Sequence, residues 1–322
     1  MNDREVADGR GIADDRGIAR ARQVLDGLAL FAQADRRAVR ITRLGGTTNL
    51  VFRIDDGAAH YVLRVPGRGT EEYINRTHEA QAAREGARVG VSPEVLQFDL
   101  ATGVMVTRLV DGAITMTPQE FRARSGAPAR AAAVLRKLHR SDAAFTFRFE
   151  LFAMIDDYLK VLAGKDVALP AGYHDVLREA GIVRAALAAQ ALPLVACHCD
   201  PLCENFLDTG IRMWLVDWEY SGLNDPMWDL GDVAVEAGFD DSQEEEMLRA
   251  YFGGEARPAD RGRVVIYKAM CDLLWTLWGL IQLANRNPAE DFQAYAFTRF
   301  GRCKQLMATA EFPRHVGNVR NG

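Results

Sequence analysis

The segment HCDPLCENF begins at His198, and the segment DWEY begins at Asp217. The first has the spacing H-x-D-x-x-x-x-N, in which the aspartate accepts the proton of a substrate hydroxyl and the asparagine reaches a magnesium ion. His198, Asp200 and Asn205 match this spacing residue for residue. Asp217 follows at the end of the next predicted strand, where a second aspartate is needed to hold the metal. Together the two segments predict phosphoryl transfer from a magnesium nucleotide.

Length and charge disfavour several classes of protein. The chain has 322 residues, which allows two lobes with a cleft between them, and a net charge of −5. A nucleic-acid partner is disfavoured because phosphate backbones are bound by clustered Lys and Arg, and the sequence has no such stripe. No apolar run approaches the ~20 residues of a membrane span, and the first residues are charged where a signal peptide would be apolar. We therefore expect a cytoplasmic protein, as a monomer or a homodimer.

Three of the five cysteines crowd into the short stretch from Cys197 to Cys203. Together with His198 they could be considered as zinc ligands, but the spacing is not C-x-x-C and no second ligand pair follows. The preceding LPLVAC has the pattern of a buried strand, in which free cysteine packs as a small apolar residue. We therefore expect reduced, buried thiols here.

Periodicity predicts a small sheet followed by a mainly helical region. A helical pattern at 17–33 precedes the alternating strands VRITRL, LVFRID and HYVLRVP, and a polar helix is expected at 71–89 before the strand GVMVTRLV. From Thr117 onward the pattern is mainly helical, interrupted by the strand that leads to His198 and by a hairpin around NFLDT and RMWLVDW. The sequence thus predicts an α+β fold. Its expected parts are a loosely ordered extension (1–16), a nucleotide-binding N-lobe (17–108) and a C-lobe with the catalytic hairpin and an acceptor pocket (109–322).

The first lobe should grip the nucleotide. Its LGGTTN segment can bring backbone amides and small hydroxyls against phosphate oxygens, although a glycine pair between strands is often only a hairpin turn. Strand HYVLRVP occupies the place where kinases carry a lysine paired with a helix glutamate, and here the candidates are Arg64 and Glu79. The forked guanidinium suits phosphate, and the alternative is a surface salt bridge. Adenine should be bound by main-chain atoms near Thr107 and Leu109. The loop residues expected to contact the nucleotide are Gly45, Gly46, Thr47, Thr48 and Asn49.

Six segments carry a resemblance to a known family, and the resemblance covers most of the chain. They are LGGTTN, the arginine of YVLRV, HCDPLCENF, DWEYSGLNDPMWDLGD, WTLWGLIQ and DFQAYAFTRF. The chain resembles the choline/ethanolamine kinases within the aminoglycoside phosphotransferase-like branch of the protein-kinase-like fold. The resemblance implies two lobes, a small antiparallel sheet lobe and a larger mainly helical lobe, with ATP between them.

The resemblance also implies roles for the carboxylates. Asp200 would be the catalytic aspartate within reach of the acceptor hydroxyl, Asn205 and Asp217 would be magnesium ligands, and Glu219 would assist them. Oxygen ligands suit magnesium, whereas the alternative for each carboxylate is a turn or a helix cap. His198 is expected to brace the loop rather than exchange protons. Two further aspartates fit a turn and a helix start better than a metal shell, namely Asp225 and Asp229.

Aromatic residues indicate the acceptor. Trp275 and Trp278 lie three apart on one predicted helix face, with Tyr295 on the next helix and Tyr220 beside the metal loop. Such rings can hold a quaternary ammonium group by cation–π attraction, and a carboxylate would supply the counter-charge. By the resemblance, Glu236 faces the ammonium and both tryptophans and Tyr295 form the aromatic wall. The alternative is that tryptophans at helical spacing belong to the core.

The sequence therefore predicts an ATP- and magnesium-dependent kinase of a small amino alcohol, with choline as first acceptor and ethanolamine as second. An aminoglycoside kinase shares the catalytic loop, but its pocket should be rich in carboxylates, and the acidic run at 240–246 is more typical of a solvated helix start. A non-catalytic pseudokinase that acts as a binding protein is suggested only by Arg64 in place of lysine. It is disfavoured because the base and both metal ligands are present.

Overall fold

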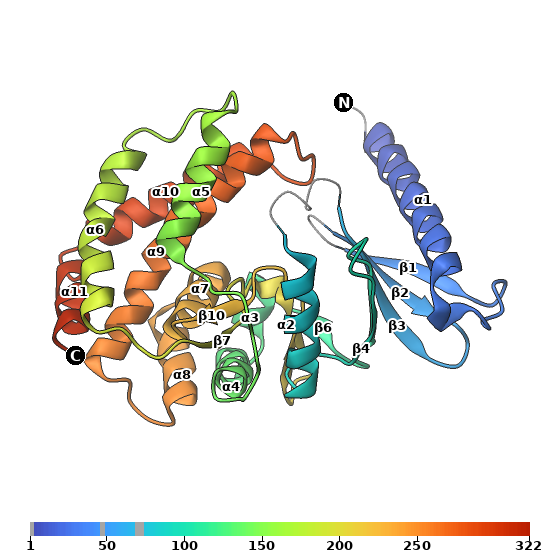
Figure 1. Ribbon diagram of the computed structural model, residues 1–322, viewed down its shortest axis with the longest axis horizontal. Coiled ribbons are helices and arrows are strands. Elements are labelled where there is room, and N and C mark those ends of the chain that lie inside the picture. Colours follow the sequence, from blue (N-terminus) through green and yellow to red (C-terminus); the bar gives the residue numbers. More distant parts are fainter. Residues whose placement is uncertain (1–2, 46–48, 68–73) are drawn as a thin grey trace.

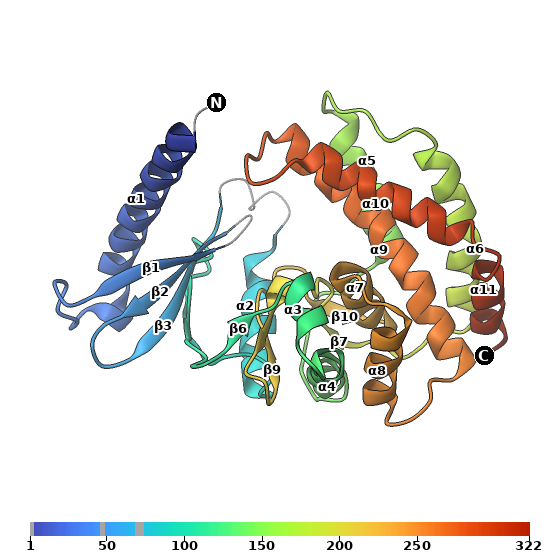
Figure 2. The same cartoon turned by 180° about the vertical axis from the view of Figure 1, so that it is seen from behind.

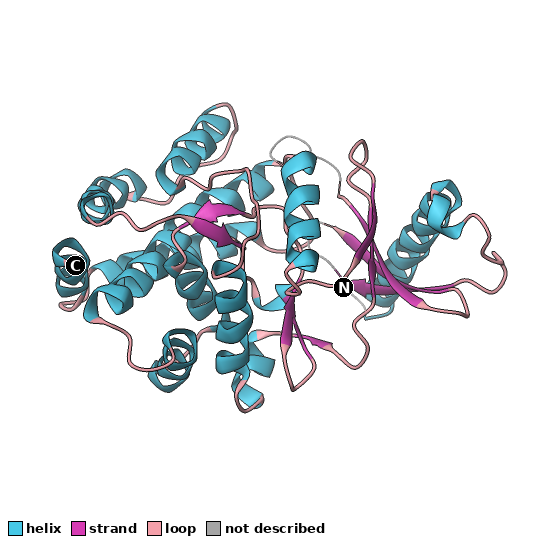
Figure 3. Ribbon diagram, turned by 60° about the horizontal axis from the view of Figure 1, so that its bottom comes forward, coloured by secondary structure: helices cyan, strands magenta, loops and turns pink. Residues whose placement is uncertain are grey.

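The chain folds into two parts, a twisted sheet and a helical body (Figures 1 and 3). The structure is a computed structural model that describes residues 3–45, 49–67 and 74–322, with only the backbone for 3–14. The sheet has the strand order β1-β2-β3-β5-β4, and every neighbouring pair is antiparallel. Its strands are β1 (Arg40–Gly45), β2 (Leu50–Asp55), β3 (His60–Val65), β4 (Val95–Phe98) and β5 (Met105–Arg108).

Helix α1 (Asp3–Gly27) covers the face of the sheet that points away from the helical body, as Figures 1 and 2 show. Ala21 and Leu25 are buried in one apolar cluster with Phe52 and Leu63 of the sheet. From the sequence we expected a loosely ordered extension over residues 1–16, whereas in the structure helix α1 already begins at Asp3. The segment contains no proline, and extending a helix that is already nucleated costs less than starting one.

Helix α2 (Arg76–Arg88) lies between the sheet and the helical body. It begins later than the expected residue 71 because the Asn75 side chain caps it, accepting from the amides of Thr77 and His78. Residues 71–73 lie outside the described ranges. A Cβ added at Gly86 would lie 2.5 Å from the ring of Trp218, so only glycine allows α2 to pack this closely against the DWEY segment.

The remainder of the chain is mainly helical, with two small antiparallel sheets, β6-β8-β9 and β10-β7. This arrangement confirms the predicted α+β class with a small antiparallel sheet and a larger helical part. The elements are β6 (Ile114–Thr115), α3 (Pro118–Ala123), α4 (Ala127–His139), α5 (Leu151–Ala163), α6 (Tyr173–Ala189), β7 (Val195–Cys197), η3 (Cys203–Asn205), β8 (Phe206–Asp208), β9 (Met213–Leu215), β10 (Gly222–Asn224), α7 (Met227–Ala237), α8 (Asp241–Phe252), α9 (Pro258–Ala284), α10 (Phe292–Met307) and α11 (Phe312–Asn321).

Helix α9 forms the centre of this body, where it packs against α5, α7, α10 and α11. We expected no apolar run that approaches a membrane span, but α9, with 27 residues, is long enough to cross a bilayer. An 18-residue window of this helix has a mean hydropathy of 1.5. However, 83 % of that window is buried inside the protein. A helix that is apolar all round is typical of the core of a large domain as well as of a membrane, and the burial of α9 favours the core.

Candidate active site

The loop from His198 to Asn205 leaves strand β7 and enters the β8–β9 hairpin in a strained turn. Cys199, next to Asp200, has a φ of 67°, and Asp217 beyond the hairpin has a φ of 65°. Residues other than glycine adopt this region at a cost, and such strain is concentrated at functional sites. Asp229 at the start of α7 holds the loop. Its Oδ2 accepts from the amide of His198 and its Oδ1 from the amide of Cys199, each at 2.8 Å.

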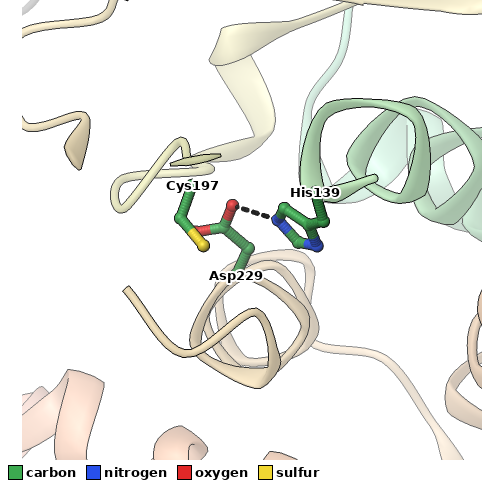
Figure 4. A group of neighbouring side chains, drawn as sticks. All are labelled: His139, Cys197 and Asp229. Atoms are coloured by element: carbon green, nitrogen blue, oxygen red, sulfur yellow. Dashed lines mark hydrogen bonds and ion pairs between the residues drawn. The ribbon is translucent and has the colours of Figure 1, made fainter. Parts of the chain in front are cut away.

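Behind the loop, Asp229 is held in turn by a buried histidine that sequence analysis missed. Figure 4 shows Asp229 between His139 of α4 and Cys197 of β7. His139 Nε2 lies 2.9 Å from Asp229 Oδ2, and His139 Nδ1 lies 2.8 Å from the hydroxyl of Tyr251. These three residues could hold a metal ion, because their ligand atoms lie within 4.8 Å of one another. Because the ring nitrogens and the carboxylate already have protein partners, we interpret the group as a brace for the loop.

His198 also braces the loop, as predicted. Its Nε2 lies 2.9 Å from the carbonyl oxygen of Val216, which ties the loop to the chain just before Asp217. Burial lowers the pKa of His198, so the neutral ring is favoured. All five cysteines are buried and free, including those that flank this histidine.

The side chain of Asn205 closes the loop onto the main chain of Asp200. The Asn205 side-chain amide donates to the Asp200 carbonyl oxygen at 2.8 Å, and the Asn205 carbonyl accepts from Val216 at 3.0 Å. Burial raises the pKa of the Asp200 carboxyl well above its usual range, and the charge of Asp217 raises it further. An aspartate with a raised pKa is better suited to accept a proton than an ordinary surface carboxylate.

Asp217 and Glu219 are bridged by Arg64, and Arg76 makes a further contact to Glu219. Arg64 Nη1 contacts Asp217 Oδ1 at 3.2 Å and Glu219 Oε1 at 3.1 Å. Arg76, at the first position of α2, contacts Glu219 Oε1 at 2.8 Å. Burial and the neighbouring charge of Glu219 raise the pKa of Asp217 to about 7. Two carboxylates held this close are destabilising unless cations compensate them.

Arg64 and Glu79 form a buried ion pair, as the kinase pattern predicted. Their side chains are 5 % and 0 % exposed, so the alternative of a surface salt bridge does not apply. Arg76 also contacts Glu79 Oε2 at 2.7 Å, and the Gly103 carbonyl accepts from Arg64 Nη2 at 3.3 Å. Carboxylate oxygens of Glu79, Asp217 and Glu219 lie within 4.8 Å of one another. Oxygen donors of this kind suit magnesium, so the residues present fit such an ion.

The predicted nucleotide loop is described only at its two ends, since Gly46, Thr47 and Thr48 lie outside the described ranges. Gly45 has a φ of 155° beside an irregularity in the β1–β2 pairing. At the other end, Asn49 is buried, and its side-chain amide lies 3.4 Å from Asp217 Oδ2. The end of the loop therefore reaches the carboxylates.

The two residues predicted to lie near adenine belong to the last part of the sheet. Thr107 on β5 pairs with Val62 on one side and Val95 on the other. The Leu109 amide donates to the carbonyl oxygen of His60 at 3.2 Å. The Leu109 amide is therefore not free to bind adenine. That other main-chain atoms between Thr107 and Leu109 bind adenine stays a prediction.

The aromatic residues form two edge-to-face pairs. Tyr220 and Trp275 have ring centroids 5.3 Å apart, and Trp278 and Tyr295 have centroids 5.6 Å apart. Trp275 is only 3 % exposed, which agrees with the core alternative, whereas the other three rings are half-buried. Trp275 Nε1 donates to Asp232 Oδ2 at 3.4 Å. Of the three residues predicted to form the aromatic wall, Trp275 is therefore buried, whereas Trp278 and Tyr295 are half-buried.

Glu236 is not the only charged residue near these rings. Its carboxylate forms an ion pair with Arg299 of α10, which sequence analysis missed although the segment DFQAYAFTRF contains it. The guanidinium carbon of Arg299 lies 4.5 Å from the centroid of the Tyr295 ring. The charges of Glu236 and Arg299 also shift the pKa of Asp200, in opposite directions, so the cluster is close enough to the catalytic loop to interact with it.

Comparison with known proteins places these clusters in a family context. The model of the phosphotransferase enzyme family matches residues 40–264, which include Asp200, Asp217 and Glu236 and end before Trp275. A solved choline/ethanolamine kinase family protein from Mesorhizobium loti is 65 % identical, with a TM-score of 0.87 over 95 % of this chain and 100 % of the other. Choline kinase LicA from Streptococcus pneumoniae is 26 % identical, with a TM-score of 0.74 over 89 % and 98 %. A structure of LicA with AMP is 28 % identical, with a TM-score of 0.70 over 84 % and 92 %.

Proposed function

The chain belongs to the phosphotransferase enzyme family and, within it, to the choline/ethanolamine kinases, and on this basis we propose that it phosphorylates the hydroxyl of choline with ATP and magnesium. Membership establishes an enzyme that binds a nucleotide and phosphorylates an alcohol group of a small amino alcohol. The single observation that carries the finer proposal is the position of Asp200 between two unlike clusters, one of carboxylates and arginines and one of aromatic rings around Glu236.

On the nucleotide side, we assign the carboxylate cluster to the metal and Arg64 to the phosphates. Asn205, Asp217 and Glu219 would hold magnesium, which would neutralise charge on the transferring phosphoryl group. Arg64 bridges Glu79 to Asp217, so it sets the distance between the sheet and the hairpin. In the free protein, Arg64 and Arg76 compensate part of the negative charge of these carboxylates. The AMP bound to the LicA relative supports a nucleotide on this side of the fold.

On the acceptor side, we assign the rings to the methylated nitrogen. Tyr220, Trp278 and Tyr295 are half-buried and present aromatic faces or edges, and Trp275 backs them from the interior. A quaternary ammonium has no hydrogen to donate, so cation–π attraction of about 0.5–2 kcal/mol per ring is its main specific contact. Asp200 would then accept the proton of the hydroxyl, which lies two carbons from the nitrogen.

Ethanolamine is the second candidate acceptor, because the cluster around Glu236 contains a buried carboxyl oxygen without a partner. Asp232 Oδ1 is buried and has no hydrogen-bond partner among the described residues. An aminoglycoside gains no support from the acidic run that begins at Asp240. Asp240 caps α8 in a capping box with Gln243, Glu244 pairs with Lys268, and Glu245 pairs with two arginines. These acids serve helix α8 and its neighbours rather than a broad substrate cavity.

We also propose that the parts function as two lobes, 17–108 and 109–322, in a cytoplasmic protein. Two separate apolar clusters support the division, one between α1 and the sheet and one through the helical body. Helix α2 contributes Ala80, Ala82 and Ala83 to the second cluster although it precedes the boundary. It would therefore move with the helical lobe if the lobes shift relative to each other.

The proposal is tested by following ADP release with ATP, magnesium and a panel of acceptors. We expect choline to give the highest kcat/KM, ethanolamine a lower value, and kanamycin no release above background. Highest activity with kanamycin, or acceptor-independent release only, would contradict the proposal.

A further inference from the structure

Arg299 occupies the acceptor cluster with the chemistry expected of the substrate's own cation. Its guanidinium is 4 % exposed, pairs with Glu236, and lies against the face of Tyr295. These are the two contacts assigned above to an ammonium group, a carboxylate and an aromatic ring. Because Glu236 is already paired with Arg299, its carboxylate attracts the cation of an incoming substrate less strongly than a free carboxylate would.

The position of Arg299 is fixed from its other side. Arg299 Nη1 contacts Asp272 Oδ1 at 3.2 Å, and Asp272 is bound again by Arg302, with Nε at 3.0 Å from Oδ2. Glu236, Arg299, Asp272 and Arg302 thus form a chain of alternating charges that runs from the pocket to the surface, where Arg302 is 40 % exposed. Withdrawing Arg299 from Glu236 would disturb a buried network, so the pair persists when a substrate arrives.

The ion pair affects two kinds of cation unequally. A primary ammonium has three N–H donors and is strongly hydrated, so it must find acceptors to replace water. The charge of Glu236 is already compensated by the guanidinium, so its carboxylate binds a second N–H donor more weakly, although its Oε1 makes no hydrogen bond among the described residues. A quaternary ammonium has no donors and needs only rings and a weak negative potential. The pair therefore costs a primary ammonium more than it costs a quaternary one.

We propose that Arg299 is a specificity-determining residue, which weakens the binding of primary ammonium acceptors by occupying Glu236 and thereby favours quaternary ones. The inference rests on the proposed function, since it names the residue that selects among amino alcohols. It is a case of discrimination by penalising the competitor rather than by adding contacts to the preferred ligand.

The remaining carboxyl group of the cluster, Asp232, supports this assignment. Asp232 lies one helical turn before Glu236 and is fully buried, with Oδ2 bonded to the indole of Trp275. Burial raises the pKa of Asp232, so its protonated and uncharged form is favoured. Asp232 therefore attracts a cation only weakly, which leaves Glu236, the partner of Arg299, as the carboxylate able to discriminate between acceptors.

The first test compares kcat/KM for choline and ethanolamine in Arg299→Met. Freeing Glu236 restores a hydrogen bond to a charged group, worth about 1.5–3 kcal/mol, so the ratio should move toward ethanolamine by roughly 10-fold or more. Arg302→Met is the matched control, because it removes the outer arginine of the same chain and should leave the ratio within about 2-fold. Equal losses for both substrates in Arg299→Met would overturn the proposal.

A second comparison remains decisive if Arg299→Met does not fold. In Glu236→Gln there is no carboxylate for Arg299 to occupy, so the double variant Glu236→Gln/Arg299→Met should show the same choline-to-ethanolamine ratio as Glu236→Gln alone. Removing both partners of a buried pair is tolerated better than removing one. A shift of the ratio in the double variant would show that Arg299 acts by another route and would overturn the proposal.

A binding measurement separates this inference from the proposed function. Tryptophan fluorescence of the full chain is titrated with tetramethylammonium and with methylammonium, without nucleotide. We expect the wild type to favour tetramethylammonium and Arg299→Met to narrow that preference by roughly 10-fold. An unchanged preference in the variant would overturn the role of Arg299. Failure to phosphorylate either amino alcohol would defeat the proposed function, while this titration would still decide the role of Arg299.

Discussion

The protein places a buried arginine on each side of Asp200, and the two have different surroundings. On the nucleotide side, Arg64 and Arg76 contact three clustered carboxylates, Glu79, Asp217 and Glu219. These arginines come from β3 and α2, so the cluster joins the sheet to the hairpin. Acidic groups outnumber basic ones here. Such a surplus is suited to a divalent cation, which would replace part of the arginine charge.

On the acceptor side, charges alternate one to one within the helical body. Arg299 and Arg302 face Glu236 and Asp272, and all four come from α7, α9 and α10. The cluster is close to neutral and has aromatic rings beside it. The comparison indicates how one loop can serve two ligands of opposite charge. The nucleotide side has more acidic than basic groups, which suits a metal-bound nucleotide, whereas on the acceptor side the paired charges are equal in number, which suits a small cation.

Removing the group shared by both clusters should have the largest effect. In Asp200→Asn, the side chain keeps its size but cannot accept the hydroxyl proton, so kcat with choline should fall by roughly 10²–10⁴-fold. Nucleotide binding should persist because Asp217 and Glu219 remain. Steady-state kinetics together with calorimetric titration of ADP and magnesium provide the measurement. Near-normal turnover would remove Asp200 from the mechanism.

Breaking the nucleotide-side cluster should lower stability in addition to weakening nucleotide binding. Arg64→Met leaves Glu79 and Glu219 buried with less compensation, and such a loss costs about 3–5 kcal/mol. Urea unfolding would measure the change in the free energy of unfolding. Arg88→Met is the control, since this arginine pairs with Glu85 and Asp142 at the surface, where pairs contribute about 0–1 kcal/mol. Similar small losses in both variants would argue against a distinct role for the buried cluster.

Removing a ring should affect the acceptor side only. Trp278→Ala takes away one partly exposed ring, so KM for choline should rise by about 2- to 30-fold, corresponding to 0.5–2 kcal/mol, with a smaller change for ethanolamine. Trp214→Ala offers a control because that ring stacks with Arg212, at 3.7 Å from the guanidinium carbon to the ring centroid, away from the pocket. Equal changes for the two substrates would leave Trp278 with a packing role.

The smallest expected effect is a pH dependence on the acceptor side. Burial raises the pKa of the Asp232 carboxyl, and the charge of Glu236 raises it further, while Asp200, Asp229 and Arg299 also act on it. The folded state thus favours the protonated form. This contribution to stability is present below the unfolded pKa, near 3.8, and is lost as pH rises through the folded value.

Asp232→Asn cannot ionise, so its free energy of unfolding should fall less than that of the wild type as pH rises from about 4 toward neutrality and above. Urea unfolding at several pH values would measure this, and the free energy of unfolding of the variant should increase relative to that of the wild type as pH rises. Asp241→Asn, at an exposed position of α8, is the control and should follow the wild-type slope. A variant whose free energy of unfolding falls more than that of the wild type as pH rises would contradict the prediction.

Local pattern was enough to predict much of this site. The spacing of His198, Asp200 and Asn205 is short-range and follows from the loop, and the pairing of Arg64 with Glu79 follows from adjacent elements. The α+β class likewise follows from periodicities of two and of 3.6 residues. Helix α1 was predicted only from residue 17, because its early residues lack an apolar stripe.

The missed residues depend on contacts between distant parts of the chain. His139 and Arg299 reach their partners across 90 and roughly 60 positions, and nothing in local spacing selects one arginine or histidine over another. Arg76 lies in a predicted polar helix, where a charged residue ordinarily faces solvent. Trp275 shows the reverse case, since it was predicted as an accessible wall residue and is almost fully buried.

The most direct test of the central claim is identification of the product by phosphorus NMR. The full chain is incubated with ATP, magnesium and choline, and the spectrum is compared with that of authentic phosphocholine. We predict one new phosphomonoester resonance at the phosphocholine position, growing in step with ADP and absent with Asp200→Asn. Inorganic phosphate as the only new species, or no change in ATP, would contradict transfer to choline.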